Sequence, residues 1–102
     1  MNEEYVNLPL VKNADDRRFE LKVGDYIAFI DYKEHDRKIW LIHTESPAEL
    51  QGKGAATALI EKTLAYLEEN GYKLIPLCPL VAAYLKRHPE WERILDESAR
   101  PF

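Results

Sequence analysis

Apolar and polar residues alternate along the early part of the chain with the period of a β-strand. Residues 18–23 alternate strictly, which predicts a strand with one buried and one solvated face. The next apolar run, from Tyr26 to Tyr32, is nearly continuous and predicts a more central strand. The dipeptide Gly24-Asp25 between the two runs predicts a two-residue hairpin loop. The apolar positions of the first strand are Phe19, Leu21 and Val23.

Two further strands are expected beside this hairpin. The polar tetrad Glu34-His35-Asp36-Arg37 predicts a turn, and the apolar run from Ile39 to His43 predicts a third strand. The earlier segment Leu8 to Lys12 predicts an edge strand, because Pro9 is tolerated at the edge of a sheet. The first part of the chain therefore predicts an antiparallel meander.

Helical spacing replaces the alternation in the second half of the chain. Asn70-Gly71 predicts the end of a long helix, and Lys73 to Leu77 predicts a short strand after it. Pro79 can begin a second helix, which runs through Tyr84 and Arg87 until the step His88-Pro89, and residues 89–95 predict one or two short helical turns. The apolar stripe of the long helix comprises Ala56, Leu59, Ile60, Leu64 and Leu67.

These elements predict an α+β fold. An antiparallel meander is extended by a strand–helix–strand unit, for which a right-handed crossover is favoured, and a second helix follows. With 102 residues, the chain is expected to form a single domain over residues 1–102.

Composition narrows the function classes. The net charge of −4 argues against nucleic acid as the main partner. One cysteine cannot form an intrachain disulfide, and no clustered His/Cys spacing indicates a metal site. No apolar run approaches the length of a membrane span, and no signal-peptide pattern is present. We therefore expect a soluble, cytoplasmic protein that is a monomer or weak dimer and contacts neither membrane nor nucleic acid.

The segment Glu49 to Ala56 carries the clearest functional pattern. It contains Gly52 and Gly54, follows an apolar strand and opens into the long helix. A helix N-terminus presents backbone N–H groups and partial positive charge, and glycine lets a ligand approach the backbone closely. The segment therefore predicts a site for a phosphorylated ligand.

Two motifs resemble those of the GCN5-related N-acetyltransferases. Gln51 to Ala56 fits the pattern Q/R-x-x-G-x-G/A of that family. Pro76-Leu77-Cys78-Pro79 with the following residues 81–89, and the triplet His43-Thr44-Glu45, resemble its small single-domain branch, often called YjdJ-like or GNAT-like. The resemblance spans about residues 13–95, which would form the core of a GNAT-like domain.

The resemblance implies acetyl-CoA as the ligand. Its pyrophosphate would bind the backbone N–H groups of the turn, and its pantetheine arm would lie along the strand end. The residues expected to bind pyrophosphate are Gly52, Lys53, Gly54, Ala55 and Ala56, and those expected to bind pantetheine are Thr44, Glu45 and Ser46.

Three side chains are candidates for catalysis of acetyl transfer. His43 is either a general base or a half-buried strand histidine. Cys78 could carry the acetyl group, exchange a proton or fill space in the core. Tyr84 resembles the helix tyrosine that protonates the CoA thiolate in many members of the wider superfamily, although packing of the ring in the core is the more common role of such a tyrosine. Direct transfer and an acetyl-Cys78 intermediate both remain open.

The expected function is transfer of acetyl from acetyl-CoA to an unidentified amine, without a metal. The alternative is a CoA-binding sensor or interaction module without turnover, since the chain is short for the family and lacks segments that build an acceptor pocket. A different phosphate ligand is disfavoured, because neither G-x-x-x-x-G-K-[S/T] nor G-x-G-x-x-G occurs.

Overall fold

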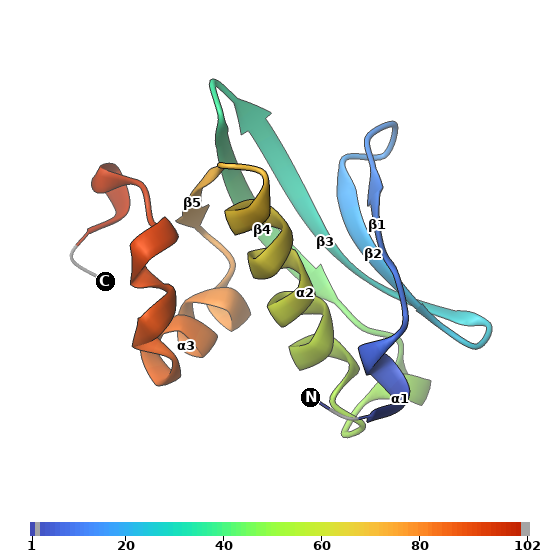
Figure 1. Cartoon of the computed structure of the whole chain (residues 1–102). Helices are drawn as coiled ribbons and strands as arrows, with labels where there is room; N and C mark the ends of the chain where they lie inside the picture. The colour runs from blue at the N-terminus through green and yellow to red at the C-terminus, as the bar shows by residue number, and fades with distance from the viewer. Residues whose placement is uncertain (2, 101–102) are drawn as a thin grey trace.

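A computed structural model describes residue 1 and residues 3–100 as one five-stranded sheet covered by helices (Figure 1). The sheet order follows the chain order, with antiparallel pairing from β1 to β4 and parallel pairing of β4 with β5. The predicted α+β class, with a meander extended by a strand–helix–strand unit, is confirmed. The strands are β1 (Leu10–Asn13), β2 (Arg18–Val23), β3 (Tyr26–His35), β4 (Lys38–Glu45) and β5 (Lys73–Pro76).

The long helix predicted between the last two strands is α2 (Ala55–Glu69), and the second predicted helix is α3 (Pro79–Arg87). Gly71, with φ 73°, follows the C-cap of α2 in the left-handed conformation that the Asn-Gly pattern predicted. The short N-terminal helix α1 (Glu3–Val6) was not predicted, because four residues carry no periodic pattern. The 3₁₀ segments are η1 (Ala48–Leu50), η2 (Pro89–Ile94) and η3 (Glu97–Ala99).

The hairpin between β3 and β4 is tighter than the predicted four-residue turn. Its loop is only Asp36-Arg37, with φ angles of 49° and 64°, and His35 pairs with Lys38. Two residues with positive φ match the twist of the flanking strands, although Asn or Gly is the usual sequence marker of such a loop. The polar residues on either side of the loop therefore belong to the strands.

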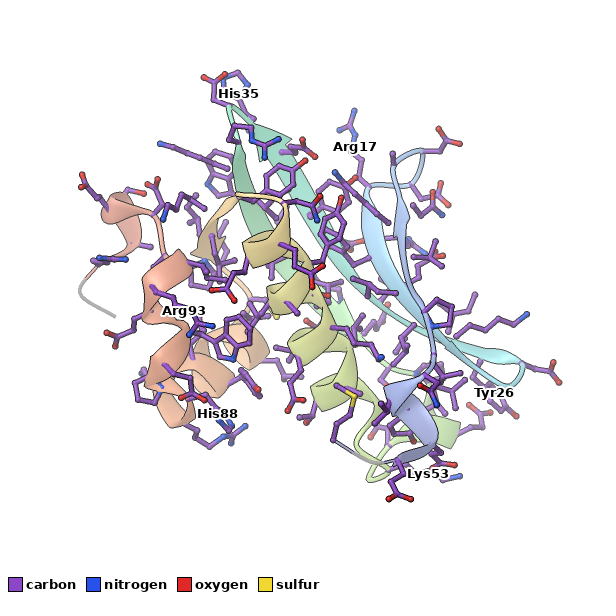
Figure 2. The ribbon with its side chains drawn as sticks, in the orientation of Figure 1. Arg17, Tyr26, His35, Lys53, His88 and Arg93 are labelled. Carbon is purple, nitrogen blue, oxygen red and sulfur yellow. The ribbon has the colours of Figure 1, made fainter. Side chains whose placement is uncertain are left out.

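One face of the sheet carries the hydrophobic core. Phe19 of β2 is fully buried and its ring lies 5.5 Å from that of Tyr66 on α2, which fixes the face that α2 covers. Helix α3 and η2 pack against α2 on the same side, where Arg93 forms an ion pair with Glu68 (Figure 2). Lys62 of α2 donates a hydrogen bond to the Val6 carbonyl of α1 (3.0 Å). Helices α1, α2 and α3 therefore share one face of the sheet.

Strands β4 and β5 separate before β4 ends. Their pairing stops at Leu41 and Pro76, and the N–H groups of Leu77 and Cys78 both donate to the Leu41 carbonyl (3.0 and 2.9 Å). Beyond this point β4 continues to Glu45, and no described residue forms a strand pair with it on its β5 side. About half of the backbone polar groups of an antiparallel strand point away from its neighbour, so this stretch of β4 offers an open edge.

A β-bulge lies at the same place. Tyr32 pairs with Leu41 but Asp31 pairs with His43, which leaves Ile42 as the extra residue of β4. Thr44 pairs with the buried Ile30 and therefore faces the helices, whereas His43 faces the opposite side of the sheet. The bulge thus decides which side chains of β4 reach the opening between the strands.

Candidate active site

A cavity of about 650 Å³ occupies the opening between the end of β4 and the start of α2. One wall is the end of β4 and the residue after it, the second is the loop and first turn of α2, and the third is Leu80 of α3. The lining residues are Thr44, Glu45, Ser46, Leu50, Gln51, Gly52, Gly54, Ala55, Ala56, Thr57 and Leu80.

The wall formed by α2 is an anion site built from backbone. Gly54 is the N-cap residue with φ 81°, and the first hydrogen bond inside the helix runs from the Ala58 N–H to the Gly54 carbonyl (3.0 Å). The N–H groups of Ala55, Ala56 and Thr57 therefore have no acceptor within the helix. Together with the helix dipole they favour a negatively charged group in the cavity.

The wall formed by the end of β4 can form hydrogen bonds with an extended polar ligand. The free edge beyond Leu41 presents backbone groups, and Thr44 and Ser46 face the cavity. The hydroxyl oxygen of Ser46 is buried and has no hydrogen-bond partner. Because an unpaired buried hydroxyl costs about 1–3 kcal/mol, a polar ligand atom at this position would be stabilising.

Lys53 is the one predicted binding residue outside the cavity lining. Its side chain is exposed at the lower end of the molecule in Figure 2, and its backbone N–H donates to the Leu50 carbonyl (3.3 Å). Among the described lining residues Glu45 alone is charged. Recognition of an anion in this cavity would therefore depend on backbone N–H groups.

His43 lies on the face of the sheet that α2 does not cover. Its side chain is 58% exposed, and Nε2 is 4.0 Å from the Oε2 atom of Glu45. Asp31 is its direct cross-strand neighbour on β3. An exposed imidazole beside the opening can accept a proton from a molecule that approaches from this face.

Cys78 lies on the helix side of the opening. Only 3% of it is exposed, it is the N-cap residue of α3, and its Sγ atom is 3.1 Å from the Oγ1 atom of Thr44. Thr44 lines the cavity and Cys78 does not, so the threonine hydroxyl stands between the cavity and the thiol. The structure therefore places Cys78 beside Thr44 and puts His43 on the other side of β4.

Tyr84 of α3 packs against α2 and η2. It is 4% exposed, and its ring stacks on His88 with 4.2 Å between centroids. Burial, and then the neighbouring carboxylate of Glu61, raise the pKa of Tyr84 to about 12. Tyr84 is not among the residues that line the cavity, although it lies one helical turn after the lining residue Leu80.

Four lining residues were not among those predicted to bind the ligand: Leu50, Gln51, Thr57 and Leu80. Thr57 could have been found, because it is the third residue of α2 and the unpaired N–H groups of a helix extend that far. Leu80 could not, because only the packing of α3 brings it to the cavity.

Residues 1 and 3–100 hold neither a metal centre nor a membrane-spanning helix. No group of three or more His, Cys, Asp or Glu side chains in that part of the chain is arranged to hold a metal ion. None of the helices described there is both long enough and apolar enough to cross a membrane.

Comparisons with known proteins identify the family and the fold. The profile of the GCN5-related N-acetyltransferases matches residues 18–94, most of the chain. A GCN5-like protein from Staphylococcus aureus, solved by NMR, superimposes with a TM-score of 0.64 and 21% sequence identity, over 95% of this chain and 99% of that one. This likeness shows a common fold, and the match to the profile shows that the chain belongs to the GCN5-related N-acetyltransferase family.

Proposed function

We propose that the protein transfers the acetyl group of acetyl-CoA to an amine. The proposal rests on one observation: a single cavity has unpaired N–H groups of α2 on one side and the open edge of β4 on the other. CoA joins a pyrophosphate to a pantetheine chain with two amides, so it has a group for each wall. The unpaired hydroxyl of Ser46 and the small side chains of Ala55 and Ala56 fit such a ligand.

Each wall has a distinct role in this proposal. Gly52, Gly54, Ala55 and Ala56 hold the pyrophosphate, and Thr57 extends their row of N–H groups. Thr44, Glu45 and Ser46 hold the pantetheine arm, largely through backbone hydrogen bonds of the kind that an added strand makes. When bound, acetyl-CoA supplies an activated thioester.

His43 is the base of the proposed reaction. The amine approaches the opening from the face of the sheet that carries His43, whose Nε2 or Nδ1 atom accepts the proton lost on attack. His43 and Cys78 lie on opposite faces of β4. An acetyl group on Cys78 would therefore lie on the helix side, away from an amine held beside His43, and this supports direct transfer from acetyl-CoA.

The test combines binding and turnover. The protein is mixed with acetyl-CoA and a panel of amines, including polyamines, amino acids and lysine-containing peptides, and both CoA release and acetylated products are measured by mass spectrometry. We expect amine-dependent release of CoA and one acetylated product class. Release no faster than the uncatalysed rate, with CoA still bound, would refute catalysis.

That outcome would support a second candidate, a CoA-binding sensor or interaction module. The observation in its favour is that the three candidate catalytic side chains do not converge: His43 lies on one face of the sheet, Cys78 contacts Thr44 on the other, and Tyr84 does not line the cavity.

A further inference from the structure

The hydroxyl of Thr44 joins the cavity to a buried thiol. Its Oγ1 atom lies 3.1 Å from the buried Sγ of Cys78, at a distance where either atom can donate the hydrogen bond. Thr44 itself lines the cavity, next to the position proposed for the pantetheine arm. A hydroxyl donates one proton and accepts others, so Thr44 can receive from Cys78 while it donates into the cavity.

Acetyl transfer needs a proton donor at this place. When the carbon–sulfur bond breaks, its electron pair stays on the CoA sulfur, which leaves more readily if it is protonated or hydrogen-bonded. Tyr84 is packed between the helices and does not line the cavity. Glu45 lines it, but its side chain is 63% exposed and its Oε2 atom lies 4.0 Å from His43 on the outer side. The hydroxyls of Ser46 and Thr57 also line the cavity, but among the described residues it is the Thr44 hydroxyl that contacts a thiol able to replace its proton.

We propose that Thr44 and Cys78 form a proton relay to the departing CoA sulfur, an inference that rests on the proposed function. The carbon–nitrogen bond to the amine forms, the carbon–sulfur bond breaks, and His43 takes the proton released by the amine. Thr44 Oγ1 gives its proton to the sulfur and takes the proton of Cys78 Sγ in the same step. Cys78 is left as a thiolate and regains a proton from water once the product thiol has left.

The energetics of the relay are balanced. Threonine alone is a poor proton donor, because an alkoxide is far too basic to form near neutral pH. With Cys78 behind it, the net transfer is from one aliphatic thiol to the thiolate of another, so no free alkoxide has to form. The Sγ atom also belongs to the N-cap residue of α3, where the helix dipole favours transient negative charge.

The kinetic test compares Thr44→Val with Thr44→Ser. Valine keeps the shape of threonine without the hydroxyl, whereas serine keeps the hydroxyl. We expect Thr44→Val to lower kcat by about 10²- to 10⁴-fold, the usual range for a proton-transfer catalyst, with little change in KM for acetyl-CoA. Thr44→Ser should restore most of the rate. Because both residues act in one relay, Cys78→Ala should add little to the loss caused by Thr44→Val.

The matched control is Thr63→Val. Thr63 is a buried threonine in the middle of α2 whose hydroxyl donates to the Leu59 carbonyl (2.7 Å), away from the cavity. Thr63→Val replaces a hydroxyl by a methyl group, as Thr44→Val does, but it should leave kcat unchanged.

An independent readout does not need turnover. The chain has one cysteine, so the infrared S–H stretching band of the free protein reports Cys78 alone. A thiol that donates to Thr44 absorbs at lower frequency than one without an acceptor. We expect the band to move to higher frequency in Thr44→Val and to stay in place in Thr44→Ser and Thr63→Val.

The relay and the proposed function fail in different ways. Wild-type protein that binds acetyl-CoA but acetylates no amine overturns both. Active wild type with an unaffected Thr44→Val variant, or an S–H band that does not respond to that change, overturns the relay alone. Gain of one acetyl group on Cys78, seen by intact mass after brief exposure to acetyl-CoA, also overturns it, since an acetylated sulfur has no proton to give.

Discussion

Lys12 on the edge strand β1 donates a 2.7 Å hydrogen bond to the carboxylate of Glu34 on β3, two strands away. The Lys12 ammonium also lies over three tyrosine rings, with Nζ between 5.2 and 5.8 Å from their centroids. Two of these rings come from α2 and the segment after it, so the pair ties the edge strand to the helix layer. The three rings belong to Tyr32, Tyr66 and Tyr72.

Loss of this cation should weaken the fold. Lys12→Met keeps most of the apolar stem and removes the charge, and we expect the free energy of unfolding to fall by about 1–2 kcal/mol, since the pair is partly exposed and each cation–π contact is weak. Urea denaturation measures the change. Lys22→Met on β2, where the side chain is exposed, is the control and should change stability by less than about 0.5 kcal/mol.

The same pair predicts a pH dependence. The hydrogen bond from Lys12 lowers the pKa of Glu34 below its usual value. A carboxyl group with a lowered pKa contributes stability above its unfolded pKa, and this contribution is lost as the pH falls through the folded value. The wild type should therefore lose more stability than Lys12→Met between about pH 5 and pH 3. Equal losses in the two proteins would contradict the assignment.

The start of α2 should bind the phosphates of CoA through its N–H groups. Ala56→Asp places a carboxylate among them, and we expect CoA affinity to fall by more than about tenfold through repulsion at short range. The fold should not suffer, because an acidic side chain in the first turn of a helix is favourable. Ala56→Asn has nearly the same shape without the charge, so the difference between the two variants in calorimetric titrations isolates the electrostatic effect. Pantetheine, which lacks the phosphates, should not distinguish them.

Ser46 should affect stability and binding with opposite signs. Its buried hydroxyl has no partner in the free protein, so Ser46→Ala should leave the free energy of unfolding unchanged or raise it by up to about 1 kcal/mol. If the hydroxyl pairs with the pantetheine arm, the same variant should bind CoA several-fold more weakly. Denaturation and titration of one preparation give both values, and a clear loss of stability would show that the hydroxyl has a structural partner.

His43 should be needed for turnover but not for binding. We expect His43→Ala to lower kcat by about 10²- to 10⁴-fold while the affinity for CoA stays within a factor of about two. His35→Ala is the control, since that histidine lies at the tip of the hairpin between β3 and β4 (Figure 2). An unchanged rate in His43→Ala would remove His43 from the mechanism.

Local pattern accounts for most of the strands and for one wall of the cavity. The alternation of residues 18–23, the Gly24-Asp25 loop and the helix between Gly54 and Asn70 all appear where the sequence predicts them. These features depend on neighbours within a few residues, which is why a sequence pattern can show them. The hairpin loop at Asp36-Arg37 was misjudged, because its positive φ angles have no Gly or Asn to mark them.

The bulge at Ile42 is a feature that the alternation of apolar and polar residues does not predict. Strict alternation would put His43 on the same face as Leu41, toward the helices, but the extra residue moves Thr44 to that face instead. Pairing with β3 and the packing of the core determine the bulge, and neither is visible in the residues of β4 alone. The position of Tyr84 is decided in the same way, by contacts with α2 and η2.

The sequence by itself determined the Gly-containing turn at Gly52 and Gly54 and the row of N–H groups at the start of α2, because glycine conformation and helix ends are local properties. Only the tertiary structure decided that Thr44 contacts Cys78, that His43 lies on the opposite face and that Ser46 is left without a partner. These relations join segments more than thirty residues apart or depend on a bulge, so they arise from the packing of the sheet and helices.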